Sequence, residues 1–289
     1  MTDFMHGMQR QTVRANGIRL NLWTGGAGSP IVVLHGFPQT GQMWRKMTQQ
    51  LMTEFSVVCP DLRGYGDSEK PRDGYEKRAM ARDIAELMRA LGHQRYVVVG
   101  HDRGARVAHR LALDHADAVT RVVVLDIVPT HTVFRDAGKD LAAAYWHWFF
   151  FQVPDLPEIM IANSAEAFLR HMLHSLAWRP GAIEEPMFQE YLRAFTLPGT
   201  IRAGMEDYRA AATVDFADDE RDLAKKLRCP LLAIWGENGK MHTLFDVLGT
   251  WKEKAVDVRG HPLPCGHFIP EEAPHELLAS VLPFLRGNN

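Results

Sequence analysis

One five-residue stretch, Gly100-His101-Asp102-Arg103-Gly104, constrains the fold of this 289-residue chain more than any other feature. It follows a short apolar strand predicted over 96–99 and precedes a helical pattern over 105–113. The two glycines lack Cβ atoms, so the backbone between strand and helix can turn sharply. The stretch therefore predicts a strand, a tight turn and a helix, with the Asp102 side chain standing clear of the sheet.

An aspartate in this position favours chemistry at a saturated carbon. A carboxylate that displaces a leaving group from such a carbon becomes an ester, and water can then attack the ester carbonyl and regenerate the aspartate. A serine in the same place would leave an ether, which water cannot easily cleave. Asp102 therefore points to a carbon–halogen bond or an epoxide as the reacting group. The alternative is a chance turn in which Asp102 only caps the helix, because Asp is a favoured N-cap residue.

Strands and helices alternate along the first half of the chain. A hairpin over 10–24 turns at Asn16-Gly17. Buried strands and helices then follow in turn, at 31–34, 42–52, 55–59, 76–91, 96–99, 105–115 and 122–125. This alternation predicts an α/β protein with a doubly wound, mostly parallel sheet and a ligand site at the carboxyl ends of its strands. Phe37, Asp102 and Asp126 all follow such ends.

The alternation stops after residue 128. Residues 129–212 show helices and loops without a convincing strand, and they include the aromatic stretch 145–151. We expect a helical cap there, inserted into a core formed by 1–128 and 213–289. The sheet pattern resumes with a strand at 231–235, a helix around 241–251, a strand near 254–259 and a closing helix over about 271–286.

The composition of the chain limits which binding partners, cofactors and cellular location we expect. The formal net charge of -2 provides no bulk attraction to nucleic acid or acidic membranes. Cys59, Cys229 and Cys265 show neither a disulfide framework nor zinc-ligand spacing, so no metal or other cofactor is expected. No targeting segment opens the chain, and no apolar run approaches the roughly 18 residues that span a membrane. We expect a soluble cytoplasmic protein.

A histidine and an acid can complete a catalytic set with Asp102. His267 lies after the last predicted strand, and the chain order nucleophile, acid, histidine is that of α/β-hydrolases. Such a histidine would activate the water that attacks the ester. The acid that orients it has two candidates. We favour Asp126, while Glu237 stays open because it lies in the loop where many such enzymes carry their acid, with Gly239 at the expected position.

Cations and backbone donors surround the predicted nucleophile. The N–H groups of Phe37 and Arg103 are placed to bind the oxyanion of the hydrolytic step. Arg103 and Arg106 are three residues apart at a helix N-terminus, so both guanidinium groups can face one carboxylate. They predict a small anionic substrate. The alternative is that Arg103 pairs with Asp126 or another acid.

Several motifs resemble the haloacetate (fluoroacetate) dehalogenase family of α/β-hydrolases. They are 100–106, 125–130, 145–148 and 207–210, while 35–39 and 61–68 also match but are shared with epoxide hydrolases. The resemblance covers nearly the whole chain. It implies that Asp102 is the nucleophile, His267 the base and Asp126 the acid that orients it. It further implies that Arg103 and Arg106 bind the substrate carboxylate. The halide would be bound by His147, Trp148 and Tyr208. It also implies a homodimer.

The chain departs from the family in the second half of the cap. Family members carry a Trp-Gly pair there, whereas this chain reads Leu176-Ala177-Trp178, and 239–242 is only loosely matched. Chloroacetate, bromoacetate or a larger acid is therefore as compatible with the sequence as fluoroacetate. Two other functions stay open. One is an epoxide hydrolase using two cap tyrosines from Tyr145, Tyr191 and Tyr208. The other is a non-catalytic ligand-binding protein on the same scaffold.

Overall fold

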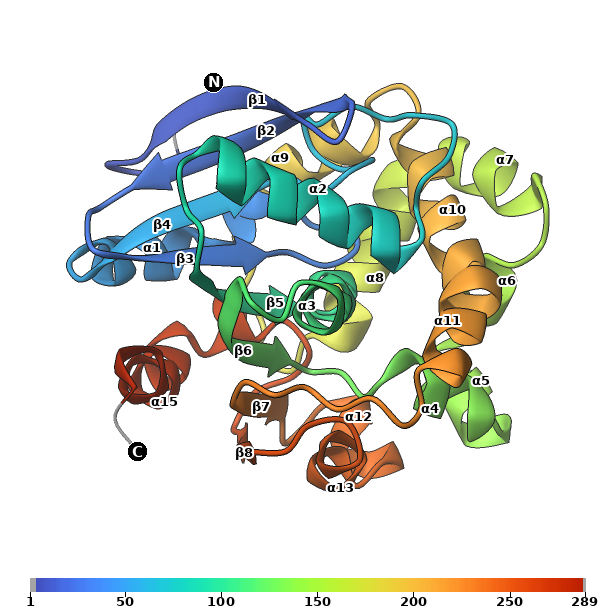
Figure 1. Ribbon diagram of the computed structural model, residues 1–289. Coiled ribbons are helices and arrows are strands. Elements are labelled where there is room, and N and C mark those ends of the chain that lie inside the picture. The colour runs from blue at the N-terminus through green and yellow to red at the C-terminus, as the bar shows by residue number, and fades with distance from the viewer. Residues whose placement is uncertain (1–3, 288–289) are drawn as a thin grey trace.

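An eight-stranded sheet forms the centre of the computed structural model, which describes residues 4–287 (Figure 1). The strands are ordered β1-β2-β4-β3-β5-β6-β7-β8. Only the pairings of β1 with β2 and of β2 with β4 are antiparallel. The strand bounds are Gln9–Ala15, Ile18–Gly25, Ser29–Leu34, Phe55–Pro60, Tyr96–His101, Val119–Leu125, Leu231–Gly236 and Val258–Leu263 for β1 to β8. The predicted α/β class with a mostly parallel sheet is confirmed.

The sequence of each strand reflects its place in the sheet. β3 and β5 lie in the middle of the sheet, and their apolar runs 31–34 and 96–99 are fully buried, as expected for parallel strands covered on both faces. The β1–β2 hairpin turns through Asn16 and Gly17, whose φ angles of 47° and 81° suit a tight hairpin turn. β8 lies at the edge, where its Pro262 is tolerated. β8 begins at Val258, so the predicted strand over 254–259 is placed too early.

Helices cover both faces of the sheet (Figure 1). α2 packs against α3, and α1 packs against α15. The core helices are η1 Gly41–Trp44, α1 Arg45–Met52, α2 Lys77–Ala90, α3 Arg103–Asp114, α12 Lys240–Leu244, α13 Val247–Lys252, α14 Ile269–Glu272 and α15 Pro274–Arg286. Two expected helices are thus each divided: the one around 241–251 breaks at 245–246, and the closing one breaks at Ala273.

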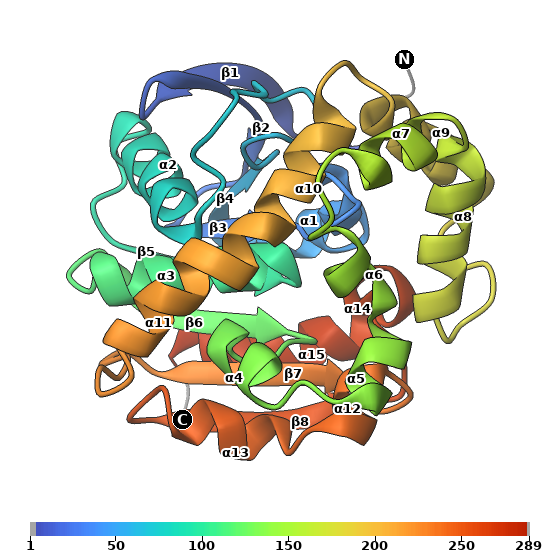
Figure 2. The ribbon, with the colours of Figure 1, turned by 90° about the vertical axis from the view of Figure 1, so that its right-hand side faces the viewer.

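Every element between β6 and β7 is helical. These elements are α4 Thr130–Arg135, α5 Lys139–Ala144, α6 Trp146–Phe150, α7 Leu156–Ala162, α8 Ala165–Leu176, α9 Glu185–Phe195, α10 Thr200–Ala210, the π-helical turn η2 Ala211–Asp215 and α11 Phe216–Arg221. The arrows of β3 and β6 point toward this group in Figure 1, and Figure 2 shows the group from its outer side. The predicted cap, 129–212, lies within it, and the domain bounds stay a prediction. Across 4–287, no helix combines the length and apolarity that crossing a bilayer requires.

Candidate active site

Asp102 sits in a strained turn between β5 and α3. Its φ of 47° lies in the left-handed region, which costs energy for a residue with a Cβ. The flanking glycines permit the close packing of this turn, because a Cβ at Gly100 would lie 2.5 Å from Ala105 Cα and one at Gly104 would lie 2.3 Å from the His35 carbonyl oxygen. The Asp102 side chain accepts no hydrogen bond from the helix start. The capping alternative is therefore wrong.

One oxygen of Asp102 is held by the loop that follows β3. The Phe37 N–H donates to Asp102 Oδ1 over 3.0 Å. Gly36 makes this approach possible, because a Cβ there would lie 2.4 Å from Asp102 Cβ. Within 4–287, Oδ2 accepts no hydrogen bond and the Arg103 N–H donates none to this carboxylate. Asp102 thus presents one anchored oxygen and one free oxygen.

His267 pairs with Asp126, which follows β6. His267 Nδ1 lies 2.6 Å from Asp126 Oδ2, and the Gly236 N–H donates to Asp126 Oδ1 over 3.0 Å. Glu237 is exposed and makes no hydrogen bond to His267. A Cβ at Gly239 would lie 3.4 Å from Asp126 Oδ1, so the site of the expected acid adjoins the carboxylate of Asp126. Of the two open acids, the geometry selects Asp126.

Burial and charge oppose each other at both catalytic candidates. Burial lowers the pKa of His267, but the hydrogen bond and negative charge of Asp126 outweigh it, and the net pKa lies above the ordinary value. Burial raises the pKa of Asp102, but the positive charge of His267 and of neighbouring cations outweighs it, and the net pKa lies below the ordinary value. Asp102 is consequently ionised at neutral pH, as a nucleophile must be.

Arg103 is buried and bound to an acid of the cap. Its Nη2 lies 2.5 Å from Asp207 Oδ1 and 2.6 Å from the Asp207 carbonyl oxygen, so the predicted pairing with an acid does occur, but with Asp207 rather than Asp126. Asp207 also accepts from Tyr65 and from Lys77 Nζ. The Arg103 Nη1 group makes no hydrogen bond to any residue of 4–287. Arg103 therefore retains one free donor group.

Among residues 4–287, no carboxylate forms an ion pair with Arg106. Its Nη1 donates to neutral acceptors, the Val128 carbonyl oxygen at 3.1 Å and Thr130 Oγ1 at 2.9 Å. Its Nε and Nη2 are buried and make no hydrogen bond within the described part of the chain. Burial, together with repulsion from Arg103, lowers the pKa of Arg106 to about 10. A buried cation is normally paired, so the donors that Arg106 and Arg103 leave unused are unusual for a protein interior.

The three predicted halide donors lie beside these arginines. His147 and Trp148 come from α6 and Tyr208 comes from α10, and all three are buried. The ring of Tyr208 lies 5.7 Å from that of His147 and 5.4 Å from that of Trp148. Burial lowers the pKa of His147 to about 3, so its ring is neutral at pH 7. The structure therefore brings together three uncharged groups with N–H or O–H donors.

Asp207 is a contributor that the sequence analysis missed. Within the motif 207–210, the family resemblance implies a function only for Tyr208, as a halide donor. Asp207 is fully buried, and burial by itself raises the pKa of its carboxyl. The positive charges of Arg103 and Lys77 outweigh this effect and hold the pKa well below its usual range. A buried acid between a core arginine and a core lysine leaves no periodic signal in sequence. Only the folded arrangement of cap on core reveals the pairing.

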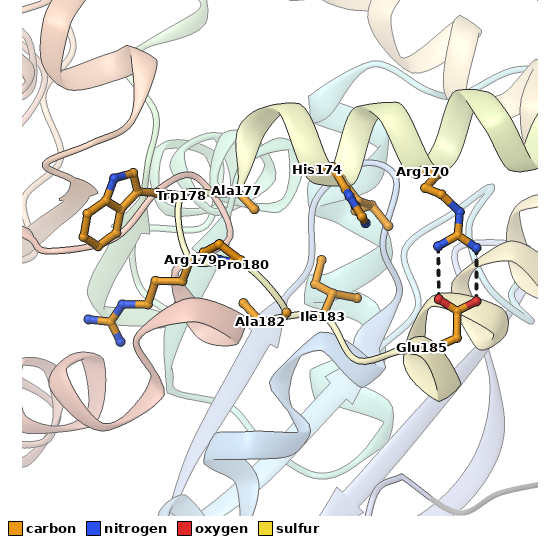
Figure 3. Close-up of a pocket in the computed structure, with 11 residues that line it drawn as sticks. Arg170, His174, Ala177, Trp178, Arg179, Pro180, Ala182, Ile183 and Glu185 are labelled. Atoms are coloured by element: carbon orange, nitrogen blue, oxygen red, sulfur yellow. Dashed lines mark hydrogen bonds and ion pairs between the residues drawn. The ribbon is translucent and has the colours of Figure 1, made fainter.

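The divergent cap segment does not contribute an indole to the site. Trp178 is 51% exposed and lines a surface pocket of about 320 Å³ between α8 and α9 (Figure 3). None of the predicted site residues lines that pocket. Leu176 instead meets the catalytic loop through its backbone, because its carbonyl oxygen accepts from the His267 N–H over 3.0 Å. In residues 4–287, no three His, Cys, Asp or Glu side chains are grouped so as to hold a metal ion.

Comparison with known proteins identifies the family. The model of the α/β hydrolase fold family matches residues 29–274. The chain belongs to the α/β-hydrolase family.

The chain is similar over nearly its whole length to two characterised proteins and to one solved structure. The chain is 39% identical to a Burkholderia sp fluoroacetate dehalogenase, over 96% of this chain and 94% of the relative. It is 38% identical to a Corynebacterium soluble epoxide hydrolase, over 93% and 94%. A Nostoc crystal structure assigned to the α/β hydrolases superposes with a TM-score of 0.96, at 47% identity over 98% of this chain and 99% of that one. This α/β-hydrolase thus has relatives of both reaction types at nearly equal identity.

Proposed function

We propose that this hydrolase removes the halogen from a small 2-haloacid, converting a haloacetate into glycolate and halide. The observation that carries the proposal is Arg106, a buried cation that interacts electrostatically with Asp102. Among residues 4–287, two of its donor groups make no hydrogen bond and no carboxylate forms an ion pair with it. A substrate carboxylate would supply the missing acceptors through charge-assisted hydrogen bonds. Asp102 alone would repel such a substrate, so a cation that is not already paired with an acid is what the reaction requires.

The first half-reaction forms an ester. Asp102 Oδ2 attacks the halogen-bearing carbon, a carbon–oxygen bond forms, and the halide leaves with the electron pair of the carbon–halogen bond. The departing anion would be met by the N–H and O–H donors of His147, Trp148 and Tyr208. Because buried halide loses its hydration, these neutral donors offset part of that cost.

The second half-reaction hydrolyses the ester. His267, oriented by Asp126, accepts a proton from water, and the water oxygen attacks the Asp102 carboxyl carbon. Negative charge then develops on Oδ1, the oxygen that the Phe37 N–H already holds at 3.0 Å. Collapse of this intermediate breaks the bond between the Asp102 carboxyl carbon and Oδ2, which leaves as the hydroxyl oxygen of glycolate and takes the proton from His267. The carboxylate is regenerated with the water oxygen, whose remaining proton passes to solvent.

The substrate should be short. The guanidinium carbon of Arg103 lies 4.3 Å from the centre of the Tyr208 ring, and that of Arg106 lies 4.6 Å from the centre of the Trp148 ring. The groups proposed to bind the carboxylate therefore adjoin those proposed to bind the halide. A two-carbon acid, whose carboxylate and halogen are on neighbouring carbons, fits this spacing.

The test is halide released from fluoroacetate, chloroacetate and bromoacetate by the protein and by Asp102→Asn. We expect halide and glycolate in equal amounts from at least one of them, and no release by the variant, whose amide cannot displace a halide. Absence of release from all three substrates would refute the proposal.

A second candidate, epoxide hydrolysis, has one observation in its favour. The Tyr145 hydroxyl is buried without a partner, and the carboxylates of Asp126 and Asp102 add to the effect of burial in raising its pKa. Together with Tyr208, it could donate to an epoxide oxygen. Tyr191 is not available, because its hydroxyl donates to Glu271 Oε1 over 2.6 Å. Diol formed from a small neutral epoxide, and retained when Arg106 is replaced, would favour this candidate.

A further inference from the structure

One buried acid binds both the loop that carries His267 and the cap. Glu272 ends α14 and is 3% exposed. Its Oε2 accepts from the Gly266 N–H at 2.9 Å, and its Oε1 accepts from the Phe268 N–H at 2.9 Å. One carboxylate therefore binds the residues immediately before and after His267.

The same carboxylate also binds the segment that follows α8. Oε2 of Glu272 accepts from the Trp178 N–H at 2.8 Å and from the Arg179 N–H at 2.9 Å. Packing here is tight, because a Cβ at Gly266 would lie 2.5 Å from the Trp178 nitrogen. Four backbone donors, two from the catalytic loop and two from the cap, thus converge on Glu272. Charged acceptors make such hydrogen bonds stronger than neutral ones.

Arg179 reinforces this connection from the outside. Figure 3 shows its side chain extending away from the surface pocket toward the C-terminal part of the ribbon. Its Nη1 donates to the Glu272 carbonyl oxygen at 2.6 Å, and its Nη2 donates to Glu276 Oε1 at 2.8 Å and to the Pro264 carbonyl oxygen at 3.0 Å. The segment that departs from the dehalogenase pattern therefore connects the cap to both ends of the His267 loop.

We propose that Glu272 is a positioning residue that fixes the His267 loop against the cap and so sets the rate of ester hydrolysis. Glu272 touches neither Asp102 nor the proposed substrate groups, and acts through the backbone on either side of His267. This inference rests on the proposed two-step reaction. His267 acts only in the second step, so a loosened loop slows hydrolysis of the ester while its formation continues.

The experiment separates the two steps in the full-length protein with Glu272→Gln. Rapid mixing with excess chloroacetate or a small epoxide gives the rate of ester formation, and intact-protein mass spectrometry follows the ester on Asp102. We expect ester formation within about threefold of wild type and hydrolysis slower on the order of 10- to 100-fold, as for a small misplacement of a catalytic group. The ester should accumulate in the variant. Arg179→Gln, a change at a partly exposed side chain, should give the same pattern more weakly.

Glu271→Gln is the matched control. Glu271 is the buried neighbour on α14. It also links core to cap, because the Tyr191 hydroxyl of α9 donates to it over 2.6 Å, and it pairs with Arg45 of the core helix α1 at 2.7 Å. Within 4–287, its side chain makes no hydrogen bond to the His267 loop. Its ratio of hydrolysis to ester formation should match that of the wild type. The inference about Glu272 would be wrong if Glu272→Gln slowed both steps equally. It would also be wrong if neither Glu272→Gln nor Arg179→Gln changed the ratio of ester hydrolysis to ester formation. Both results would leave the proposed function intact. Failure of the wild type to form an ester with either substrate would overturn the proposed function as well.

Discussion

Replacing Arg106 by Met separates binding of the substrate anion from folding. Arg106 offers Nε and Nη2 to an anion, and each charge-assisted hydrogen bond contributes about 1.5–3 kcal/mol. Truncating one partner of a buried charge pair costs about 2–5 kcal/mol, and Arg103 keeps one donor, Nη1. At about 1.4 kcal/mol per tenfold, kcat/KM for chloroacetate should fall by roughly thirty- to several-thousand-fold.

The stability of the same variant should hardly change. Arg106 is a buried charge without a counter-ion, so its removal relieves a desolvation cost that offsets the loss of its hydrogen bonds to Val128 and Thr130. Arg103→Met is the contrasting variant. It leaves the carboxylate of Asp207 with Lys77 as its remaining cation and should lower the free energy of unfolding by about 3 kcal/mol, the lower end for a broken buried pair.

Steady-state halide release and urea unfolding of both variants provide the measurements. Loss of activity in Arg106→Met with an unchanged unfolding midpoint would agree with an anion site. Full activity toward haloacetates in Arg106→Met would refute the reasoning, and so would a loss of stability as large as that of Arg103→Met, because Arg106 would then be structural.

Three further predictions follow from the same geometry. The rate of ester hydrolysis should rise with pH through a pKa above about 6.5, because His267 must be neutral to accept a proton and its pKa is raised. A rate that rises only below about pH 6.5 would contradict the role of His267 as the base. Gly36→Ala should abolish halide release, because its Cβ would lie 2.4 Å from Asp102 Cβ, whereas Gly138→Ala, with no atom within 4 Å, should be fully active in the same assay. Asp126→Asn should lower kcat by up to about ten-thousand-fold, while Glu237→Gln should leave kcat unchanged. Equal kcat values for the two variants would show that Asp126 is not the acid that orients His267.

Local patterns in the sequence predicted most of the core. Continuous apolar runs identified β3, β5 and β7, and the pair of glycines around Asp102 identified the turn, because both features are dictated by neighbours along the chain. The last strand was placed a few residues early. Its exposed, Gly- and Pro-containing sequence at the sheet edge lacks the apolar run that marks the central strands.

Contacts in the site between residues that are distant in the chain could not be predicted from the sequence. Arg103 and Arg106 look equivalent as neighbours on one helix, yet Arg103 is bound to Asp207 and Arg106 to no acid. That difference depends on how α10 lies over α3. The sequence favoured Asp126 as the acid but left Glu237 open. The folded structure separates them, because His267 Nδ1 lies 2.6 Å from Asp126 Oδ2 and Glu237 is exposed. Residues distant in sequence decide these contacts.

The central claim, that Asp102 becomes an ester during turnover, is tested most directly by trapping that ester. His267→Gln can still carry out the first half-reaction but lacks the base for the second. After incubation with chloroacetate and proteolysis, mass spectrometry should find the glycolyl ester on the peptide that contains Asp102, with one chloride released per protein molecule. Chloride released catalytically without any adduct, or an adduct on another residue, would contradict the account.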